Sequence, residues 1–463
     1  MKERSKKISA LLLTGCLCIS LLAGCGNNAD STQKKDTPAE ESGTSADEST
    51  ENDKEQTVAE DDSSKGGERS ITLMASQNWI KDVDRELFKK FEEETGIEVK
   101  ISVTPDNEYA TLLGTTLSGG SDAVDIFMHA AGSEMISAGI PDVAVDLSGE
   151  SWVANMEDWA KEANTYDGKV VGFSTWGIDY EGVIYNKTFF EENNLEVPST
   201  WDEFMGLCDQ ILELGVTPLY ESINGTWHTQ SWVYGLTPAM RQEKADFVEY
   251  LNAGKDNKFA DIAAFGEGIA QLQELLSAAE GGEYKYFTND GQSEDWFGSY
   301  TSLQNRETVM MFTYSAYPAE LAANGVTDEF GMFPVPLLDN KIPVSNGGGV
   351  SKYISKNSKN IEECKQLFNF LSEKENLETY YGQRTDLVTA AFKDVDSVSA
   401  TLATTEVMER SGSKSEVMFI KEVLYWDPDI YQYLQGLADG SISVEQLITN
   451  VDDYRAVMFD TTE

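Results

Sequence analysis

Apolar residues change their spacing twice between residue 71 and residue 103. The run ITLMA at 71–75 is continuous and apolar, which is typical of a buried strand. The next apolar positions recur at helical spacing and share one face: Val83, Leu87, Phe88 and Phe91. Gly96 favours an end to this helix, and the alternating apolar residues at 97–103 predict a second strand. The pattern therefore predicts a strand–helix–strand unit with parallel strands.

A second unit of the same kind follows. Apolar residues at 109–117 recur at helical spacing, Gly119 and Gly120 interrupt them, and VDIFM at 124–128 predicts another buried strand. Repeated units of this kind predict an α/β fold with a parallel sheet. Open sheets of this class bind ligands just beyond the C-terminal ends of their strands.

Polar and aromatic residues follow two of these predicted strands. Gln77, Asn78 and Trp79 come directly after the first strand, where a turn usually holds small residues, and His129 follows VDIFM. Two amides, an indole and an imidazole at strand ends are candidate ligand contacts. For Trp79 the alternative is burial under the following helix, and for His129 it is a satisfied polar residue.

Length and charge exclude several classes of function. A chain of 463 residues suits two or three domain-sized units. Its 80 acidic and 35 basic residues give a formal charge of −45, which would repel nucleic acid and an anionic membrane surface. We therefore expect no nucleic-acid partner, and anionic solutes are less favoured as ligands.

The first 25 residues have the pattern of an export signal. Basic residues near the start precede an apolar run that is short for a membrane-spanning helix, and the run ends in LAGC at 22–25. LAGC resembles a lipobox, in which small residues precede a cysteine that receives a diacylglycerol thioether. The resemblance implies cleavage before Cys25, a lipid anchor on that residue and an extracytoplasmic location at the cell membrane. An ordinary cleaved signal is the alternative.

Residues 26–69 differ in composition from the rest of the chain. Ser, Thr, Asp and Glu dominate and aromatic residues are absent, which predicts a disordered acidic tether. Only Cys208 and Cys364 remain in the folded part, both on predicted amphipathic helices, so we expect two free buried thiols. The sequence has no metal-binding spacing, and we expect no metal or cofactor.

Three segments carry a resemblance to a known family. They are YNKTFFEENNLEVPSTWDEF at 185–204, ETVMMFTYSAYPAEL at 307–321, and the glycine-rich stretch with its following helix at 344–376. In this order, behind a lipobox, they resemble the family 1 extracellular solute-binding proteins, the group that includes maltose-binding protein. The similarity extends over essentially all of residues 70–463.

The resemblance implies a two-lobe α/β clamp of the periplasmic-binding-protein type, with a ligand cleft between the lobes and hinge crossovers. Lobe 1 would hold residues 70–180 and about 346–395, and lobe 2 residues 181–345 and about 396–463, with crossings near 178–182 and 344–350. It implies capture of a carbohydrate by hinge closure and delivery to the permease transmembrane subunits of an ABC importer, without chemistry on the ligand. We expect a monomer.

A sugar site combines aromatic faces for the C–H surface with carboxylate, amide or Arg partners for the hydroxyls. By the resemblance, Glu181 corresponds to a ligand-bonding carboxylate and Trp426 lies close to a stacking tryptophan. The other expected substrate contacts, besides the strand-end residues, are Trp176, Asp179, Trp227, Tyr314, Tyr317, Gly348 and Arg384. We assign Trp152, Trp159 and Trp201 to packing or to helix starts.

Two other functions stay open. The same clamp could serve as a ligand sensor that docks on a membrane receptor, and the sequence does not separate this role from transport. A surface glycoside hydrolase would need two carboxylates about 5–10 Å apart across the sugar bond. Asp179 and Glu181 alternate on one predicted extended segment, and the sequence supplies no second pair to oppose them.

Overall fold

The computed structural model describes residues 69–462 apart from 78, 119–123, 223–225, 278–283, 289–295, 385–386 and 396–400. The predicted signal, the lipidation of Cys25 and the tether lie outside the described residues, as does Asn78. Residues 69–463 form one compact unit. Within the described part, no helix is both long enough and apolar enough to cross a membrane.

The first sheet contains the two predicted strand–helix–strand units. Its strands, in the spatial order β2-β1-β3-β12-β6, are β2 (Ile97–Thr104), β1 (Arg69–Ser76), β3 (Ile126–Ala130), β12 (Val350–Ile354) and β6 (Gly172–Phe173). β1 pairs in parallel with β2 and β3, as the sequence predicts, whereas β12 runs antiparallel to β3 and β6. The C-terminal ends of β1 and β3 therefore lie at the same edge of this sheet.

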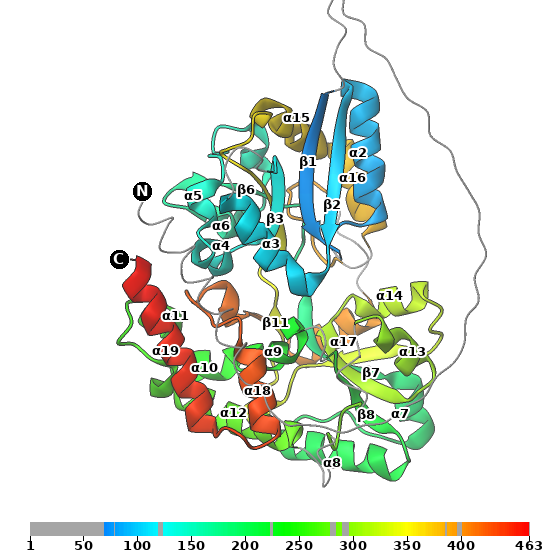
Figure 1. The fold of residues 1–463 in the computed structure, drawn as a ribbon. Helices are drawn as coiled ribbons and strands as arrows, with labels where there is room; N and C mark the ends of the chain where they lie inside the picture. Colours follow the sequence, from blue (N-terminus) through cyan, green and yellow to red (C-terminus); the bar gives the residue numbers. More distant parts are fainter. Residues whose placement is uncertain are drawn as a thin grey trace, which may run out of the picture. The chain divides into compact units, whose positions relative to one another are not determined.

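Helices cover the first sheet. In Figure 1, α2 and α16 lie side by side along β1 and β2. The helices of this part are α2 (Asp82–Thr95), α3 (Asp106–Ser118), α4 (Ser133–Ser137), α5 (Ile140–Val143), α6 (Asp158–Ala163), α15 (Ile361–Leu371), α16 (Lys374–Gln383) and the 3-10 turn η1 (Ser151–Asn155); β4 (Thr165–Tyr166) and β5 (Lys169–Val170) form a small hairpin. The apolar face of α2 is buried at every predicted position.

The second sheet contains β13 (Glu416–Val417), β11 (Val344–Ser345), β7 (Tyr180–Asn186), β9 (Thr308–Tyr314) and β8 (Thr217–Tyr220) in that order. β10 (Phe330–Phe333) also pairs with β7, beside β11. Its helices are α7 (Lys187–Asn193), α8 (Trp201–Glu213), α9 (Thr226–Tyr234), α10 (Thr237–Glu243), α11 (Phe247–Asn252), α12 (Ala263–Leu276), α13 (Gly298–Gln304), α14 (Tyr317–Ala323), α17 (Leu402–Arg410), α18 (Ile430–Ala438) and α19 (Val444–Thr462), with 3-10 turns η2 (Phe259–Asp261), η3 (Leu337–Asp339) and η4 (Phe419–Lys421).

Both expected free thiols are present in the cores. Cys208 and Cys364 are unpaired and buried, one in the core of each sheet. Trp152 and Trp201 are buried in the same two cores, as assigned, and Trp159 is half-buried against the core of the first sheet.

Two described segments connect the sheets. Residues 174–179 link β6 to β7, and residues 346–349 link β11 to β12. The crossings are bonded to each other, because the Asp179 N–H donates to Asn346 Oδ1 and the Asn346 N–H donates to the Asp179 carbonyl, each at 3.2 Å. The chain thus passes from the first sheet to the second before Tyr180, where β7 begins, and returns before Val350, where β12 begins.

Residues 388–389 brace the first crossing. The Ile178 N–H donates to Thr389 Oγ1 at 2.8 Å, and the Val388 N–H donates to the Ile178 carbonyl at 3.3 Å. A Cβ on Gly177 would lie 1.7 Å from the Thr389 carbonyl oxygen, so only glycine permits this approach. The crossings are therefore short backbone segments held in a fixed arrangement.

Candidate ligand-binding site

Strand ends from both sheets approach the crossings. β3 ends at Ala130 in the first sheet, while β7 begins at Tyr180 and β9 ends at Tyr314 in the second. Glu181 lies directly opposite Tyr314 in the β7–β9 pair, and directly opposite residues project on the same face of a sheet. The fold therefore places a carboxylate and a phenol side by side at the start of the second sheet.

Glu181 is an acidic residue at the start of β7. Its side chain is half-buried, and its carboxylate accepts no hydrogen bond from the described residues. Burial raises the pKa of Glu181 to about 7; the charge of Glu134 adds to this rise, whereas Lys421 and His228 oppose it. A desolvated carboxylate without a donor is suited to accept hydrogen bonds from a ligand.

An ion pair joins α4 to η4 near Glu181. The Lys421 ammonium donates to the Glu134 carboxylate across a separation of 287 residues, with both side chains partly shielded from solvent. Ser133 Oγ also donates to the Ile420 carbonyl at 2.5 Å. A Cβ on Gly132 would lie 2.6 Å from the Lys421 carbonyl oxygen, so the two segments are in direct backbone contact. Nothing in the local sequence around Glu134 or Lys421 predicts this pair.

His129 lies at the end of β3 as a neutral imidazole. Burial lowers its pKa, and the opposing effects of the Ala130 carbonyl and Glu134 do not reverse that shift. Its Nδ1 lies 2.9 Å from the Ala130 carbonyl oxygen, so Nδ1 carries the proton and donates. Nε2 of the half-buried ring is then a hydrogen-bond acceptor.

Aromatic rings form a wall behind Tyr314. The half-buried Tyr314 ring stacks on Trp296 with centroids 5.8 Å apart and planes 10° from parallel, and its hydroxyl donates to Glu320. Tyr317 is fully buried behind this pair, with its hydroxyl bonded to Ser299 Oγ. Tyr314 presents the accessible part of the wall. Trp296 could not be predicted as a part of it, because the sequence before this residue has no regular apolar pattern.

Two tryptophans rest on the glycine-rich crossing. A Cβ on Gly349 would lie 2.3 Å from Trp176 Cδ1, and one on Gly348 would lie 2.8 Å from Trp159 Cζ3. Both glycines have positive φ, 104° for Gly348 and 59° for Gly349, so the crossing needs glycine for its backbone and for its ring contacts. Both indoles are half-buried. Trp159, assigned to packing, therefore also borders this region.

Four expected contact residues are buried in the interior. Asp179 is 2% exposed, Arg384 1%, Tyr317 0% and Trp426 8%. Trp426 packs edge-on against Phe419 with centroids 4.8 Å apart, in the core of the second sheet. In this structure these side chains offer no surface to a ligand, because each fills a position that the fold itself occupies.

Asp179 and Arg384 have specific interior partners. Asp179 accepts hydrogen bonds from Ser315 Oγ at 2.5 Å and from the Tyr180 N–H at 2.8 Å. Burial raises the pKa of Asp179 to about 7, although these hydrogen bonds oppose the rise. The Arg384 guanidinium lies 4.7 Å from the Trp176 ring centre and so supports that indole from behind. Both residues support the site instead of lining it.

The residues after β1 are only partly exposed. Trp79 is half-buried and meets Tyr109 edge-on with centroids 5.0 Å apart, so the indole belongs partly to the core. Gln77 is exposed, and its N–H donates to the Thr104 carbonyl at 2.9 Å. Asn78 and the side chain of Trp227 lie outside the described residues. Among the described residues, no group of three or more metal-ligating side chains is present.

Comparisons with known proteins point to one family. The profile described as bacterial extracellular solute-binding protein matches residues 79–378. The multiple sugar-binding protein of Streptococcus mutans is 24% identical over 305 residues, which cover 64% of this chain and 69% of that protein.

Solved structures show the same fold. A chitin oligosaccharide binding protein superposes with a TM-score of 0.68 at 16% identity, covering 84% of this chain and 99% of that one. A sugar transporter protein from Bacillus licheniformis, solved in complex with stachyose, has a TM-score of 0.65 at 16% identity and covers 84% and 100%. The two-lobe α/β fold predicted from the sequence is confirmed.

Proposed function

Because the chain belongs to the bacterial extracellular solute-binding protein family, we propose that it captures a carbohydrate between two lobes and delivers it to an ABC importer. The relatives described above are binding proteins, which places the chain among binding proteins at the level of the family. The proposed lobes are residues 70–180 with about 346–395, and 181–345 with about 396–463. Ligand contacts to both lobes would favour the closed state.

The observation that carries the proposal is the pairing of Glu181 with Tyr314. A half-buried carboxylate without a hydrogen bond from the described residues stands beside a tyrosine ring that is fixed by stacking on Trp296. A sugar needs both features, because its hydroxyls donate hydrogen bonds and its C–H face packs on aromatic carbon. The accessible edges of Trp79 and Trp176, the Nε2 of His129, and the backbone of Gly348 are proposed as further contacts.

The relatives support the ligand class. One is called a multiple sugar-binding protein, and the structural neighbours bind a chitin oligosaccharide and stachyose. The formal charge of −45 favours a neutral ligand over an anionic one, because bulk repulsion opposes the approach of an anion. We therefore propose a neutral sugar or oligosaccharide.

A thermal-shift screen against a sugar panel tests the ligand class. A ligand that binds only the native state stabilises it by about 2.7 kcal/mol at 100 times its Kd. We expect at least one neutral sugar to raise the Tm, and calorimetry to show weaker binding by Glu181→Gln and Tyr314→Ala. Glu213→Gln, an exposed residue on α8, is the control. If no sugar raises the Tm while a peptide, a polyamine or a metal does, a carbohydrate ligand is excluded.

Uptake separates delivery from sensing. Cells that lack the chain, but retain the permease and ATPase subunits, should lose uptake of the sugar found in the screen and regain it with the wild-type gene. Unchanged uptake combined with altered receptor signalling would favour the sensor. Catalytic release of shorter sugars by purified protein, abolished by Glu181→Gln, would instead favour a hydrolase.

Anchoring is tested independently of ligand binding. We propose that Cys25 carries the lipid, so Cys25→Ser should move the chain from the membrane fraction to the medium. A Cys25→Ser variant that stays in the membrane fraction would exclude this anchor. Light scattering of the soluble folded part is expected to give a monomer mass.

A further inference from the structure

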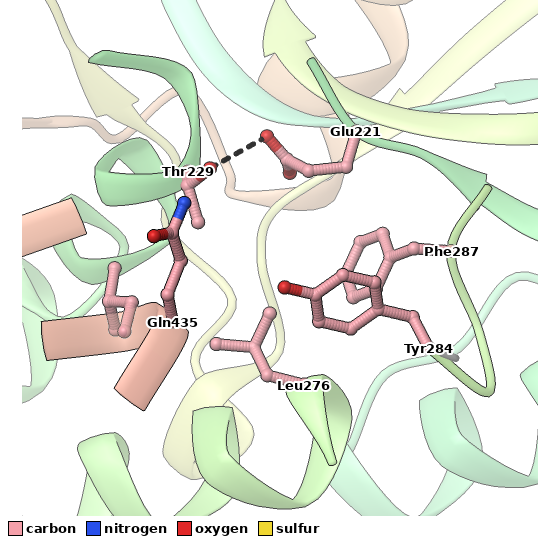
Figure 2. A pocket seen from close by; sticks show the side chains of 7 residues that line it. Glu221, Thr229, Leu276, Tyr284, Phe287 and Gln435 are labelled. Carbon is pink, nitrogen blue, oxygen red and sulfur yellow. Dashed lines mark hydrogen bonds between the residues drawn. The ribbon is translucent and has the colours of Figure 1, made fainter. Parts of the chain in front are cut away.

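A buried carboxylate beside the second sheet contacts the only histidine of that part of the chain. Glu221, just after β8, is 1% exposed, and His228 on α9 is equally buried. His228 Nδ1 lies 2.5 Å from Glu221 Oε1, and Trp232 Nε1 donates to Glu221 Oε2 at 2.9 Å. Thr229 Oγ1 also donates to Glu221, at 3.4 Å, at the edge of a small pocket into which Tyr284 turns its hydroxyl (Figure 2).

The contacts of His228 define its charge. Nδ1 faces the Glu221 carboxylate, and Nε2 lies 2.8 Å from the carbonyl oxygen of Phe312. A carbonyl oxygen only accepts, so Nε2 donates. Glu221 accepts from Thr229 Oγ1 and from Trp232 Nε1, so both of its oxygens act as acceptors and Nδ1 donates as well. With both ring nitrogens donating, His228 is an imidazolium ion in a buried pair.

The electrostatics agree with this geometry. Burial alone lowers the pKa of His228, but the charge and hydrogen bond of Glu221, together with the Phe312 carbonyl and the charge of Glu181, raise it above its ordinary value of 6.5. Glu221 and Glu181 are the acidic groups that act on the ring, and Glu181 is itself subject to Lys421 and Glu134.

His228 is connected to the proposed ligand contacts in two ways. Its ring meets Trp296 edge-on with centroids 5.5 Å apart, and Trp296 stacks on Tyr314. Its Nε2 bond fixes Phe312, two residues before Tyr314 on β9. Its positive charge also opposes the rise in the pKa of Glu181. Both members of the Glu181–Tyr314 pair therefore depend on this ring.

We propose that His228 is a positioning residue: as an imidazolium held by Glu221 it orients the Trp296–Tyr314 stack, so that ligand affinity depends on one buried proton. The inference rests on the proposed function, because Tyr314 and Glu181 are the proposed ligand contacts. Affinity is then expected to fall as the pH rises through the raised pKa of His228, where the proton is lost.

The charge of His228 can be measured without ligand. The chain has two histidines, His129 and His228, so the ¹⁵N spectrum of the imidazoles contains two ring systems, and His129→Gln assigns them. At pH 6.5 both nitrogens of most His228 rings should carry protons, whereas His129 should be neutral. In Glu221→Gln the proton of His228 should be lost at a lower pH. A neutral His228 at pH 6.5 in the wild-type chain would overturn the inference.

Affinity against pH then tests the positioning role. For a sugar found in the screen, we expect Glu221→Gln and His228→Gln to raise Kd about tenfold at pH 7, which is about 1.4 kcal/mol. The wild-type loss of affinity at alkaline pH should shift to lower pH in Glu221→Gln and vanish in His228→Gln. Glu213→Gln, at an exposed position of α8, should keep the wild-type profile.

The outcomes separate the two proposals. If the Kd of His228→Gln depends on pH as the wild-type Kd does, and is only higher by the same factor at every pH, His228 has a structural role only. This result would overturn the positioning role. If no sugar binds while His228 is an imidazolium, the proposed function fails on its own. Near-UV circular dichroism then tests whether the His228 proton orients the aromatic stack. The Trp296–Tyr314 signal should change with the His228 proton in the wild type and not in His228→Gln.

Discussion

The buried carboxylate of Asp179 gives the hinge region a measurable dependence on pH. Asp179 is 2% exposed and lies in the first crossing, where Ser315 Oγ and the Tyr180 N–H donate to it. Burial raises its pKa from 3.8 to about 7 despite these donors. Asp179→Asn keeps the shape and an acceptor oxygen but removes the ionisation, so it isolates the cost of the buried charge.

The sign and size of the effect follow from this shift. An acid whose pKa is higher in the folded state than in the unfolded state binds its proton more tightly when folded. The contribution of Asp179 to stability is therefore complete below pH 3.8 and is lost as the pH rises to about 7. One pKa unit corresponds to about 1.4 kcal/mol. Between pH 4.5 and pH 8, Asp179→Asn should therefore gain roughly 3 kcal/mol of stability relative to the wild-type chain.

Urea unfolding of the two proteins at several pH values measures this difference. The relevant quantity is the difference in unfolding free energy between Asp179→Asn and wild type, because all other titrating groups are common to both. Asp453→Asn, at an exposed position of α19, is the matched control and should give a much flatter difference. A flat difference for Asp179→Asn, or one that falls with pH, would show that burial does not raise the pKa of Asp179.

Three further predictions concern the crossings, the ion pair and the thiols. Gly349→Ala places a Cβ 2.3 Å from Trp176 Cδ1 at a φ of 59°, so urea unfolding should show a loss of more than about 2 kcal/mol. Gly206→Ala, in α8 with nothing within 4 Å of the new Cβ, should instead gain about 0.5–1 kcal/mol, and equal effects would refute the strain argument. Lys421→Met and Glu134→Gln should show a coupling of about 1 kcal/mol in a double-mutant cycle that shrinks in high salt, whereas additive effects would mean that the pair contributes nothing. The two free cysteines of the described part should react with a thiol reagent only on unfolding, and rapid labelling of the native chain would contradict their burial.

The sequence predicts the fold well in those elements whose apolar residues keep one spacing over the whole length of the helix or strand. The helical face starting at Val83 is predicted correctly because α2 buries it against a single core. The alternation at 97–103 predicts β2 correctly, although only Ile97 of its apolar residues is fully buried and Val103 is exposed. The amphipathic helix predicted around Cys208 is α8, in which Phe204 and Ile211 are fully buried beside Cys208. Short strands such as β11 and β13 hold two residues each and contain no period to detect.

The candidate site was predictable only in part. Glu181 came from the family resemblance, and Tyr314 came from its place at the end of a strand within a resembling segment. The Glu134–Lys421 pair could not be read, because 287 residues separate its members and neither has a distinctive local pattern. Trp426 lies in the core of the second sheet, which the sequence could not show because an indole suits a sugar face and a hydrophobic core equally well.

The mutual hydrogen bonds between Asp179 and Asn346 have a consequence for measuring closure. Two independent crossings would let the lobes both bend and twist, so several distances would be needed to describe the motion. Because these backbone segments are tied to each other, bending about one shared axis is the motion that breaks neither bond. We therefore expect a single intramolecular distance, between a label on β2 and a label on α8, to report the degree of closure along one coordinate.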